Sequence, residues 1–332
     1  MDSLTQLVLG ASVAALAAPP HHRRKALALG AALGTLPDLD VFIDFGGAVD
    51  NFTRHRGFSH SLFVLAPVAV LLWLALRRWW APVRESPSRW FGAIALALLT
   101  HPLLDAHTAY GTQLFWPLHS PPVKWATIFI IDPLFTLPLL AAVIYALAKP
   151  RARRSGAALG AALAWSSLYL GWSWAAQGIV SRHAAASLAE QGLAGAPRFV
   201  TPTPFNTLLW RVVVMTDEGY LEGFDSLVQD EGRMAFASYP SDTAALESAA
   251  NIPAVQRLRW FAGDFVRAQV VDRQLQVADL RMGQEPVYVF THVVARRGNP
   301  RWHAVETELL PVDFADRSLK EVWHRIWRQG GA

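Results

Sequence analysis

The sequence has 332 residues, of which 52% are hydrophobic, 17% are charged and none is cysteine. Soluble domains carry about 25% charged residues, so this composition and a mean hydropathy of +0.23 indicate a chain that lies partly in a membrane. The apolar content excludes a disordered chain. The absence of cysteine excludes disulfides, cysteine-ligated zinc and a cysteine nucleophile.

The charge distribution divides the chain into two parts. Residues 1–178 contain 14 Lys/Arg and 8 Asp/Glu, whereas residues 179–332 contain 16 and 18. Six apolar stretches lie in the first part, at about 3–18, 26–43, 59–76, 91–106, 126–147 and 156–177. A membrane-spanning helix needs roughly 20 apolar residues. We therefore predict an α-helical integral membrane domain of about six helices over residues 1–178, in which the shorter stretches are tilted, half-buried or re-entrant.

Basic residues predict the orientation of this domain. The loops after the first, third and fifth stretches carry 11 Lys and Arg, whereas the opposite side carries Arg54, Arg56 and Lys124. Cytoplasmic loops of membrane proteins are enriched in Lys and Arg. We therefore expect the N-terminus and residues 179–332 to lie outside. The net charge of +4 is then a topology signal, and we predict no nucleic-acid partner.

Polar segments with metal-ligand side chains recur at the predicted outer edge of the membrane. They are residues 2–6, 37–40, 55–61 and 101–107. His101 and Asp105 are four residues apart and therefore share one helical face. Neutral imidazole together with carboxylate suits Zn²⁺, Mn²⁺ or Fe²⁺, and ionisable groups at the bilayer are costly and usually functional. The sequence therefore predicts a metal site.

The predicted metal ligands are Asp38, Asp40, His55, His60, His101 and Asp105, and Asp2, Gln6 and Asp132 are candidate ligands or second-shell residues. Structural alternatives exist for some of them. Asp2 is also a natural helix N-cap, Asp38 and Asp40 can cap a loop, and His60 alone can be a hydrogen-bonded interface histidine.

The combined pattern resembles the membrane-bound metal-dependent hydrolases, a family of LexA-regulated inner-membrane proteins. The matching segments are Thr5 to Gly10, Pro37 to Asp40, His55 to Ser61 and His101 to Asp105, followed by residues 110–113, 116–117 and 131–133. The resemblance covers roughly residues 1–150 and implies a bacterial inner membrane location and Tyr110 as a substrate contact. Gln6 stands where many members have histidine. The family is also similar to zinc-dependent phospholipases C, which implies phosphoester hydrolysis. The residues themselves do not distinguish it from acyl-ester or amide hydrolysis.

Metal-assisted hydrolysis is the mechanism that these residues suggest. Zn²⁺, as one or two ions, lowers the pKa of a bound water to about 7, with Mn²⁺ or Fe²⁺ as alternatives. His107 or Asp40 is the candidate general base. Arg56 is the candidate partner of a substrate phosphate, or alternatively an anchor to lipid phosphate.

Residues 179–200 contain small residues and prolines, and we predict a helix end and linker there. Strands are predicted at 208–216, 220–227, 258–266, 270–280 and 287–296, with 304–310 as a further candidate and an amphipathic helix at 318–328. Residues 201–332 therefore form a small, mostly antiparallel α+β domain outside the membrane. Asn206, Arg211 and Arg281 are polar residues in apolar runs and thus candidate substrate contacts, or else buried pairs inside the sheet.

Taken together, these features predict a multi-pass inner-membrane metallohydrolase with a periplasmic site. A membrane lipid or lipid-linked phosphoester is the expected substrate, because a site at headgroup depth suits a substrate that diffuses in the bilayer. Two other functions remain open, a metal-ion transporter and a metal-stabilised membrane scaffold. The sequence does not determine the oligomeric state.

Overall fold

The computed structural model describes residues 1–299, 301–312 and 319–328, and the chain divides into two compact units. The first unit comprises Met1–Phe42, Arg56–Trp125 and Phe129–Ser173, and the second comprises Ile43–His55, Ala126–Ile128 and the chain from Trp174 onward. The first unit is helical and the second contains antiparallel sheets. A helical N-terminal region followed by an antiparallel C-terminal domain is therefore confirmed.

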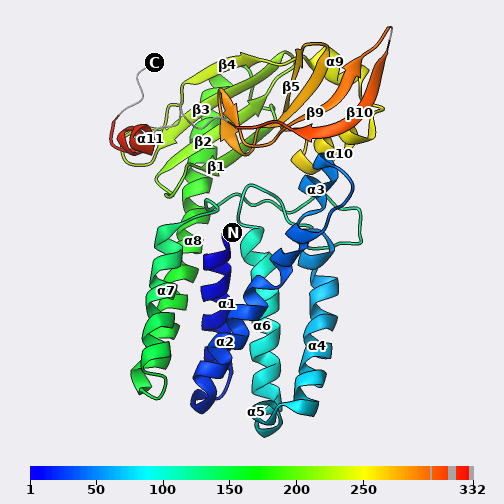
Figure 1. The fold of residues 1–332 in the computed structure, drawn as a ribbon. Helices are drawn as coiled ribbons and strands as arrows, with labels where there is room; N and C mark the ends of the chain where they lie inside the picture. Colours follow the sequence, from blue (N-terminus) through cyan, green and yellow to red (C-terminus); the bar gives the residue numbers. More distant parts are fainter. Residues whose placement is uncertain (300, 313–318, 329–332) are drawn as a thin grey trace. The chain divides into compact units, whose positions relative to one another are not determined.

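Helices form in all six apolar stretches. They are α1 (Ser3–Ala17), α2 (Arg23–Thr35), α4 (Leu62–Trp79), α6 (Pro87–Asp105), α7 (Pro133–Ala148) and the first part of α8 (Arg153–Glu190). Short helices connect them, namely η1 (Pro20–His22), η2 (Pro37–Phe42), η3 (Phe58–His60) and α5 (Ala81–Glu85). Figure 1 shows α1 beside α2, α6 and α7, with α4 against α6.

Within the described residues, α4 is the helix that is long and apolar enough to cross a membrane, and α1 and α7 are shorter apolar helices. Membrane crossing by all six helices therefore stays a prediction. The exposed side of α4 is consistent with lipid contact, because Leu71 and Leu74 are exposed while Leu65 and Ala69 are buried on the other side.

Three glycines let α1 and α2 approach closely. A Cβ added at Gly10 would lie 2.3 Å from the Gly30 carbonyl oxygen, and one added at Gly34 would lie 2.5 Å from the Gln6 carbonyl oxygen. Gly30 and Gly34 are four residues apart, which is the spacing that brings helix backbones together in membranes. This contact fixes the position of the Gly34 carbonyl group, which contributes to the site described below.

We expect Gly30→Ala to destabilise the first unit by about 1–3 kcal/mol, because the new methyl group would lie 2.3 Å from Gly10 O and 2.5 Å from the Ala14 Cβ. Thermal unfolding in neutral detergent measures this effect. Gly160→Ala in α8 is the matched control, since its Cβ would meet no described atom within 4 Å. Helix propensity alone should stabilise that variant slightly. Equal loss of stability in both variants would contradict close packing at Gly30.

The second unit contains α3 (Ala48–Arg54), the remainder of α8 and two four-stranded antiparallel sheets. The first sheet has the order β1 (Arg198–Pro202), β2 (Leu209–Met215), β3 (Gly219–Ser226) and β4 (Phe236–Pro240). The second has the order β10 (Trp302–Leu309), β9 (Thr291–Arg297), β6 (Gln274–Asp279) and β5 (Val266–Val271). The remaining elements are the hairpin β7 (Gly283–Gln284) and β8 (Val287–Tyr288), and helices α9 (Thr243–Ser248), α10 (Pro253–Ala262) and α11 (Leu319–Ile326).

Strand β2 is buried on both faces. Trp210 and Val212 pack with Val180 and Ala184 of α8 on one face, and Val213 packs with Tyr220, Ala278 and other residues on the opposite face. Because both faces are covered, the strand is a continuous apolar run rather than an alternating one. This explains why the predicted strand at 208–216 was readable from the sequence.

The predicted strand at 258–266 is wrong, because most of it belongs to helix α10. Val255, Leu258 and Phe261 are buried at helical spacing, Pro253 starts the helix, and Gly263 ends it with φ of 67°. The segment predicted as one strand at 270–280 is not a single continuous strand. It forms the end of β5, a turn and β6, because Asp272 and Arg273 both adopt positive φ (47° and 63°).

Residues 179–190 form the end of α8 and β1 begins at Arg198, so the segment predicted as a helix end and linker, 179–200, contains a helix end and a short connection. Helix α11 lies within the predicted 318–328 segment, of which residue 318 is outside the described residues.

His292 is a buried histidine in the core of the second unit. It lies on β9, its ring centroid is 5.3 Å from that of Phe52, and neither ring nitrogen has a hydrogen-bond partner among the described residues. Burial lowers the pKa of His292 to about 4. The unfolded chain, with a histidine pKa of about 6.5, therefore binds this proton more readily than the folded chain.

We expect this histidine to make the second unit sensitive to acid. Its contribution to stability is fully present above about pH 6.5 and is lost as the pH falls toward 4, to a total of about 3 kcal/mol. Thermal unfolding of the full chain at pH 7 and pH 5 measures this loss, which should be smaller in His292→Phe. His303→Phe, which removes an exposed histidine of β10, should keep the wild-type pH dependence. The prediction fails if the two variants behave alike.

Candidate metal centre

Four of the predicted ligands come together in the first unit. Asp38 lies in η2, His60 in η3, and His101 and Asp105 lie one turn apart on α6. One side-chain nitrogen or oxygen of each lies within 4.8 Å of the others. His60 Nε2 is 3.0 Å from His101 Nε2 and 3.1 Å from Asp105 Oδ2, and Asp38 Oδ1 is 3.3 and 3.4 Å from the two imidazole nitrogens.

Short turns bring these segments to one point. Pro37 begins the η2 turn directly after α2 and aims Asp38 toward α6. The chain reverses at Arg56, whose φ is 60°, and then forms η3, which places His60 directly before α4. Ser61 is the N-cap of α4, and its hydroxyl oxygen accepts a hydrogen bond from the Phe63 N–H.

A backbone carbonyl sets the tautomer of His101. The Nδ1 atom of His101 lies 2.6 Å from the Gly34 carbonyl oxygen. Since a carbonyl oxygen only accepts hydrogen bonds, Nδ1 carries the proton of the neutral ring. The lone pair of His101 is therefore on Nε2, the atom that faces the other three side chains.

Ser59 and Asp40 set the tautomer of His60 in a similar way. The Ser59 hydroxyl donates to Asp40 Oδ2, so its oxygen is left to accept from His60 Nδ1, 2.9 Å away. Asp40 Oδ2 also accepts from the Arg56 backbone N–H at 3.0 Å. Asp40, predicted as a ligand, thus supports His60 from behind, as carboxylates commonly support metal-binding histidines.

These tautomers direct four lone-pair atoms at one another. The imidazole nitrogens lie 3.0 Å from each other and 3.1–3.4 Å from the Asp38 and Asp105 oxygens, so these atoms need a positive charge between them, which a proton or a metal ion supplies. The buried Oδ2 atom of Asp105 accepts no hydrogen bond from a described residue. The group therefore fits a metal ion, and its N/O donor set is of the kind that binds Zn²⁺, Mn²⁺ or Fe²⁺.

Polar side chains hold Asp105 in place. Its Oδ1 atom accepts from Gln6 Nε2 at 2.9 Å and from the Met1 amino group, and Gln6 Nε2 also donates to the His101 carbonyl oxygen at 3.1 Å. Gln6 therefore orients Asp105 through a hydrogen bond and is not itself one of the four grouped ligands. Arg56, only 3% exposed, has its Nε 3.3 Å from Asp105 Oδ2.

Arg56 is itself fixed by two further groups. Its NH1 donates to the Thr108 hydroxyl at 3.1 Å, and its guanidinium carbon lies 4.9 Å from the centre of the Tyr110 ring. Arg56 and Tyr110, both predicted substrate contacts, are thus placed beside the metal centre. Their contact with a substrate stays a prediction.

Three other predicted ligands lie outside the group found among the described residues. His55 ends α3 in the second unit, and the Arg56 turn separates it from His60. Asp2 is the N-cap of α1 and accepts from the Thr5 N–H at 3.0 Å. Asp132 is the N-cap of α7 and also accepts from the Tyr169 hydroxyl at 2.8 Å.

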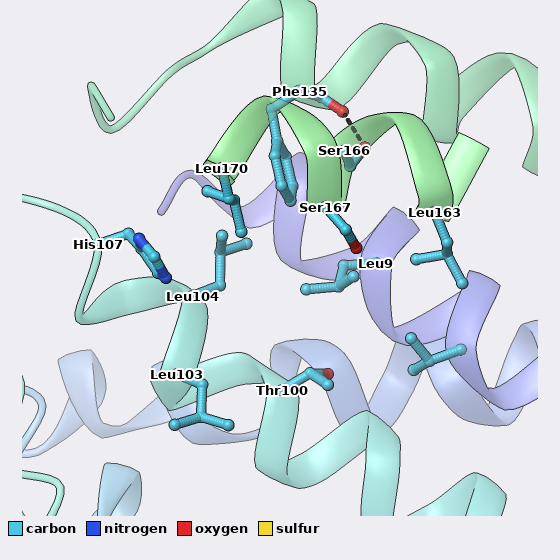
Figure 2. Close-up of a pocket in the computed structure, with 11 residues that line it drawn as sticks. Leu9, Thr100, Leu103, Leu104, His107, Phe135, Leu163, Ser166, Ser167 and Leu170 are labelled. Carbon is cyan, nitrogen blue, oxygen red and sulfur yellow. Dashed lines mark hydrogen bonds between the residues drawn. The ribbon is translucent and has the colours of Figure 1, made fainter. Parts of the chain in front are cut away.

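His107, the candidate general base, lies just beyond the end of α6. Figure 2 shows its ring at the edge of an apolar pocket of about 210 Å³. The pocket is lined by Leu9, Val13, Thr100, Leu103, Leu104, His107, Phe135, Leu163, Ser166, Ser167 and Leu170. Burial lowers the pKa of His107 to about 4, so the ring is neutral at pH 7.

Three predicted substrate contacts are engaged within the second unit. Asn206 Oδ1 accepts from the Leu208 and Leu209 N–H groups. Arg211 is paired with Glu222, and Arg281 with Asp279. Both arginines are almost fully buried, which corresponds to the buried pairs that the sequence left as the alternative.

Two groups that orient the ligands, the Ser59 hydroxyl and the Gly34 carbonyl, were not predicted from the sequence. Ser59 had a signal, because it directly precedes His60 in the segment His55–Ser61. The Gly34 carbonyl had none, since every residue has a backbone carbonyl and only helix packing brings this one to His101.

Comparisons with known proteins agree with a membrane location. The family described as YdjM inner membrane protein matches residues 1–180. "Inner membrane protein YbcI" of Escherichia coli (strain K12) is 35% identical over 111 residues, which cover 33% of this chain and 60% of that protein. "Uncharacterized protein YfhP" of Bacillus subtilis (strain 168) is 29% identical over 157 residues, which cover 43% of this chain and 45% of that protein. The matches thus span about half the length of these relatives, and no solved structure is significantly similar to the chain.

Proposed function

The chain belongs to the YdjM inner membrane protein family, and on that premise we propose that its first unit is a metal-dependent hydrolase of a membrane lipid or lipid-linked phosphoester. His60 and His101 carry this proposal. Each ring donates from Nδ1 to a neighbouring acceptor, and the two Nε2 atoms lie 3.0 Å apart and face two carboxylates. Such second-shell orientation is characteristic of metal ligands.

The residues of the centre divide into three roles. Asp38, His60, His101 and Asp105 would hold the ion, which when bound would polarise a substrate oxygen and lower the pKa of a water molecule. Asp40 and Ser59 keep the His60 ring in the binding tautomer. Arg56 balances the charge of Asp105 and presents its guanidinium for a phosphate oxygen.

The exposure of the ligands supports an approach over Asp38. The Asp38 side chain is 19% exposed, whereas those of His60, His101 and Asp105 are fully buried. Large apolar side chains are exposed next to it in the chain, namely those of Leu36, Leu39, Val41 and Phe42, and Phe58 is exposed two residues before His60. Exposed apolar clusters of this kind mark membrane or ligand contacts, so an amphiphilic substrate fits this surface.

The apolar pocket beside His107 supports the same substrate class. Its lining is mostly leucine and phenylalanine, which suits a hydrocarbon chain. Leu104 lines the pocket and the adjacent Asp105 belongs to the metal group. In this proposal, the hydrocarbon chain of a lipid contacts the pocket beside Leu104, and its headgroup lies at the metal group that includes Asp105.

We place the centre on the periplasmic side, because the loops at the opposite end of these helices carry the 11 Lys and Arg. Fusions of a reporter enzyme to the loop after α4 and to the C-terminus test this orientation. The loop fusion should be active only with a cytoplasmic reporter, and the C-terminal fusion only with a periplasmic one. The reverse pattern would overturn the orientation and leave the metal centre untouched.

A lipid digest tests the hydrolase. The purified chain is incubated with total bacterial lipid extract, with chelator, and with chelator followed by Zn²⁺ or Mn²⁺, and the products are identified by mass spectrometry. We expect a cleaved headgroup or diacylglycerol-type product that disappears with chelator and returns with metal. Absence of metal-dependent products across all lipid classes would overturn the proposal.

A metal-stabilised scaffold is the second candidate, because full burial of three of the four ligands also suits a closed structural site. It predicts that chelation lowers the thermal unfolding midpoint while no lipid is cleaved under any metal condition. The hydrolase predicts metal-dependent products whether or not the midpoint moves. The same digest, run beside a thermal unfolding scan, therefore separates the two functions.

A further inference from the structure

A second cavity, of about 630 Å³, lies at the opposite end of α2 from the metal centre. It is formed where η1 leads into α2 and where α7 connects to α8. Its lining consists of Pro20, His21, His22, Arg24, Lys25, Lys149, Pro150, Arg151 and Ala152. Arg23 holds the two connections together, because its NH1 donates to the Pro150 carbonyl oxygen at 2.5 Å.

Four cations of this cavity have no acidic partner among the described residues. Within the described part of the chain, no ion pair involves Arg24, Lys25, Lys149 or Arg151. Arg24 Nε donates to the Leu147 carbonyl oxygen at 3.1 Å, which keeps its charge at the cavity without neutralising it. The nearby carboxylate, Glu85, is paired with His22 at 2.9 Å. The cavity therefore carries a concentrated positive charge.

Two helices add to this field. Helix α2 begins at Arg23 and α8 begins at Arg153, and neither has an acidic residue in its first turn. The N-terminal end of a helix is already positive and has free N–H groups, so cations there are unfavourable unless an anion is present. His22 precedes α2 without a side-chain capping hydrogen bond. The two helix ends thus add to the positive field of the cations, which favours an anion.

We propose that this cavity binds a phosphate group, that of an anionic lipid headgroup or of a small phosphate compound. His21, His22 and Glu85 could by themselves hold a metal ion, but the four neighbouring cations would repel it. The lining belongs to the loops that we expect on the cytoplasmic side, where anionic lipids attract basic residues. This site is independent of the hydrolase proposal, since it shares no residue with the metal centre.

Thermal unfolding of the full chain in neutral detergent tests the site with three probes, which are phosphatidylglycerol, phosphatidylcholine and inorganic phosphate. Phosphatidylglycerol should raise the midpoint and phosphatidylcholine should not. The variant Lys25→Gln/Lys149→Gln/Arg151→Gln should need at least roughly tenfold more phosphatidylglycerol for half the effect. The charge-conserving Lys25→Arg/Lys149→Arg variant should bind as the wild type does.

The matched control is Arg77→Gln/Arg78→Gln/Arg84→Gln, which removes three cations from the end of α4 and from α5, and none from the cavity. It should retain wild-type binding. If inorganic phosphate alone stabilises the chain and competes with the lipid, the ligand is a soluble phosphate compound; if it does neither, the ligand is a lipid headgroup. Equal weakening in both triple variants, no preference for phosphatidylglycerol, or stabilisation by Zn²⁺ that requires His21 and Glu85 would each overturn the site.

Discussion

Alanine in place of His101 should remove the bound metal ion and lower metal-dependent lipid hydrolysis on the order of a thousandfold or more. The ring supplies one of the two imidazole nitrogens, and its loss leaves one imidazole and two carboxylates, which hold the ion more weakly. A metal ion contributes several kcal/mol to stabilising transition-state charge, which corresponds to this factor. Elemental analysis of the purified protein and the lipid digest measure the two effects separately.

A graded series tests the same assignment more sharply. Ser59→Ala removes the acceptor of His60 Nδ1 but no ligand, so metal affinity should fall by about 10–100-fold while excess metal restores activity. His119→Ala, which removes an exposed histidine, should change neither quantity. Unchanged metal content in a folded His60→Ala/Asp105→Ala double variant would contradict the metal centre.

Leucine in place of Glu222 should destabilise the second unit by about 3–5 kcal/mol, because Arg211 would be left buried without its carboxylate. Arg211 is 3% exposed, its Nε donates to Glu222 Oε2 at 2.9 Å, and its NH1 donates to the Leu280 carbonyl oxygen at 2.7 Å. Thermal or denaturant unfolding of the full chain, followed in the sheet domain by near-ultraviolet circular dichroism, measures the loss.

Two comparisons identify the cause of that loss. The double variant Arg211→Met/Glu222→Leu should recover most of it, since it removes both charges. Glu247→Leu should change stability by less than about 1 kcal/mol, because Glu247 and Arg259 form an exposed pair. A Glu222→Leu variant as stable as Glu247→Leu would show that the buried pair contributes little.

The ligand types and much of their grouping could be predicted from the sequence. His101 and Asp105 share a helical face by spacing alone, and Asp38 and His60 lie in short polar segments between apolar ones. The choice between His55 and His60 could not be predicted, because both flank the same glycine. The positive φ of Arg56 and the η3 turn decide it, and neither has a reliable sequence signal.

The second unit shows the same limit in its strands and helices. The strand at Leu209–Met215 was predictable because both of its faces are buried. The residues of α10 were mistaken for a strand, since a short apolar segment satisfies both periods. Its Pro253 start and Gly263 end are the local signals that favour the helix.

By itself, the sequence determined the division into an apolar and a polar part, the six helical stretches, the segregation of charge between loops and the imidazole–carboxylate chemistry of the centre. These are properties of composition and spacing, which do not depend on distant contacts. Tertiary structure alone decided which histidine faces Asp38, that Asp40 and Ser59 support a ligand from behind, and that the Gly34 carbonyl sets the tautomer of His101. Each of these depends on how closely separate helices pack, here on glycines that let α1 and α2 approach, and side-chain chemistry read along the chain carries no information on that distance.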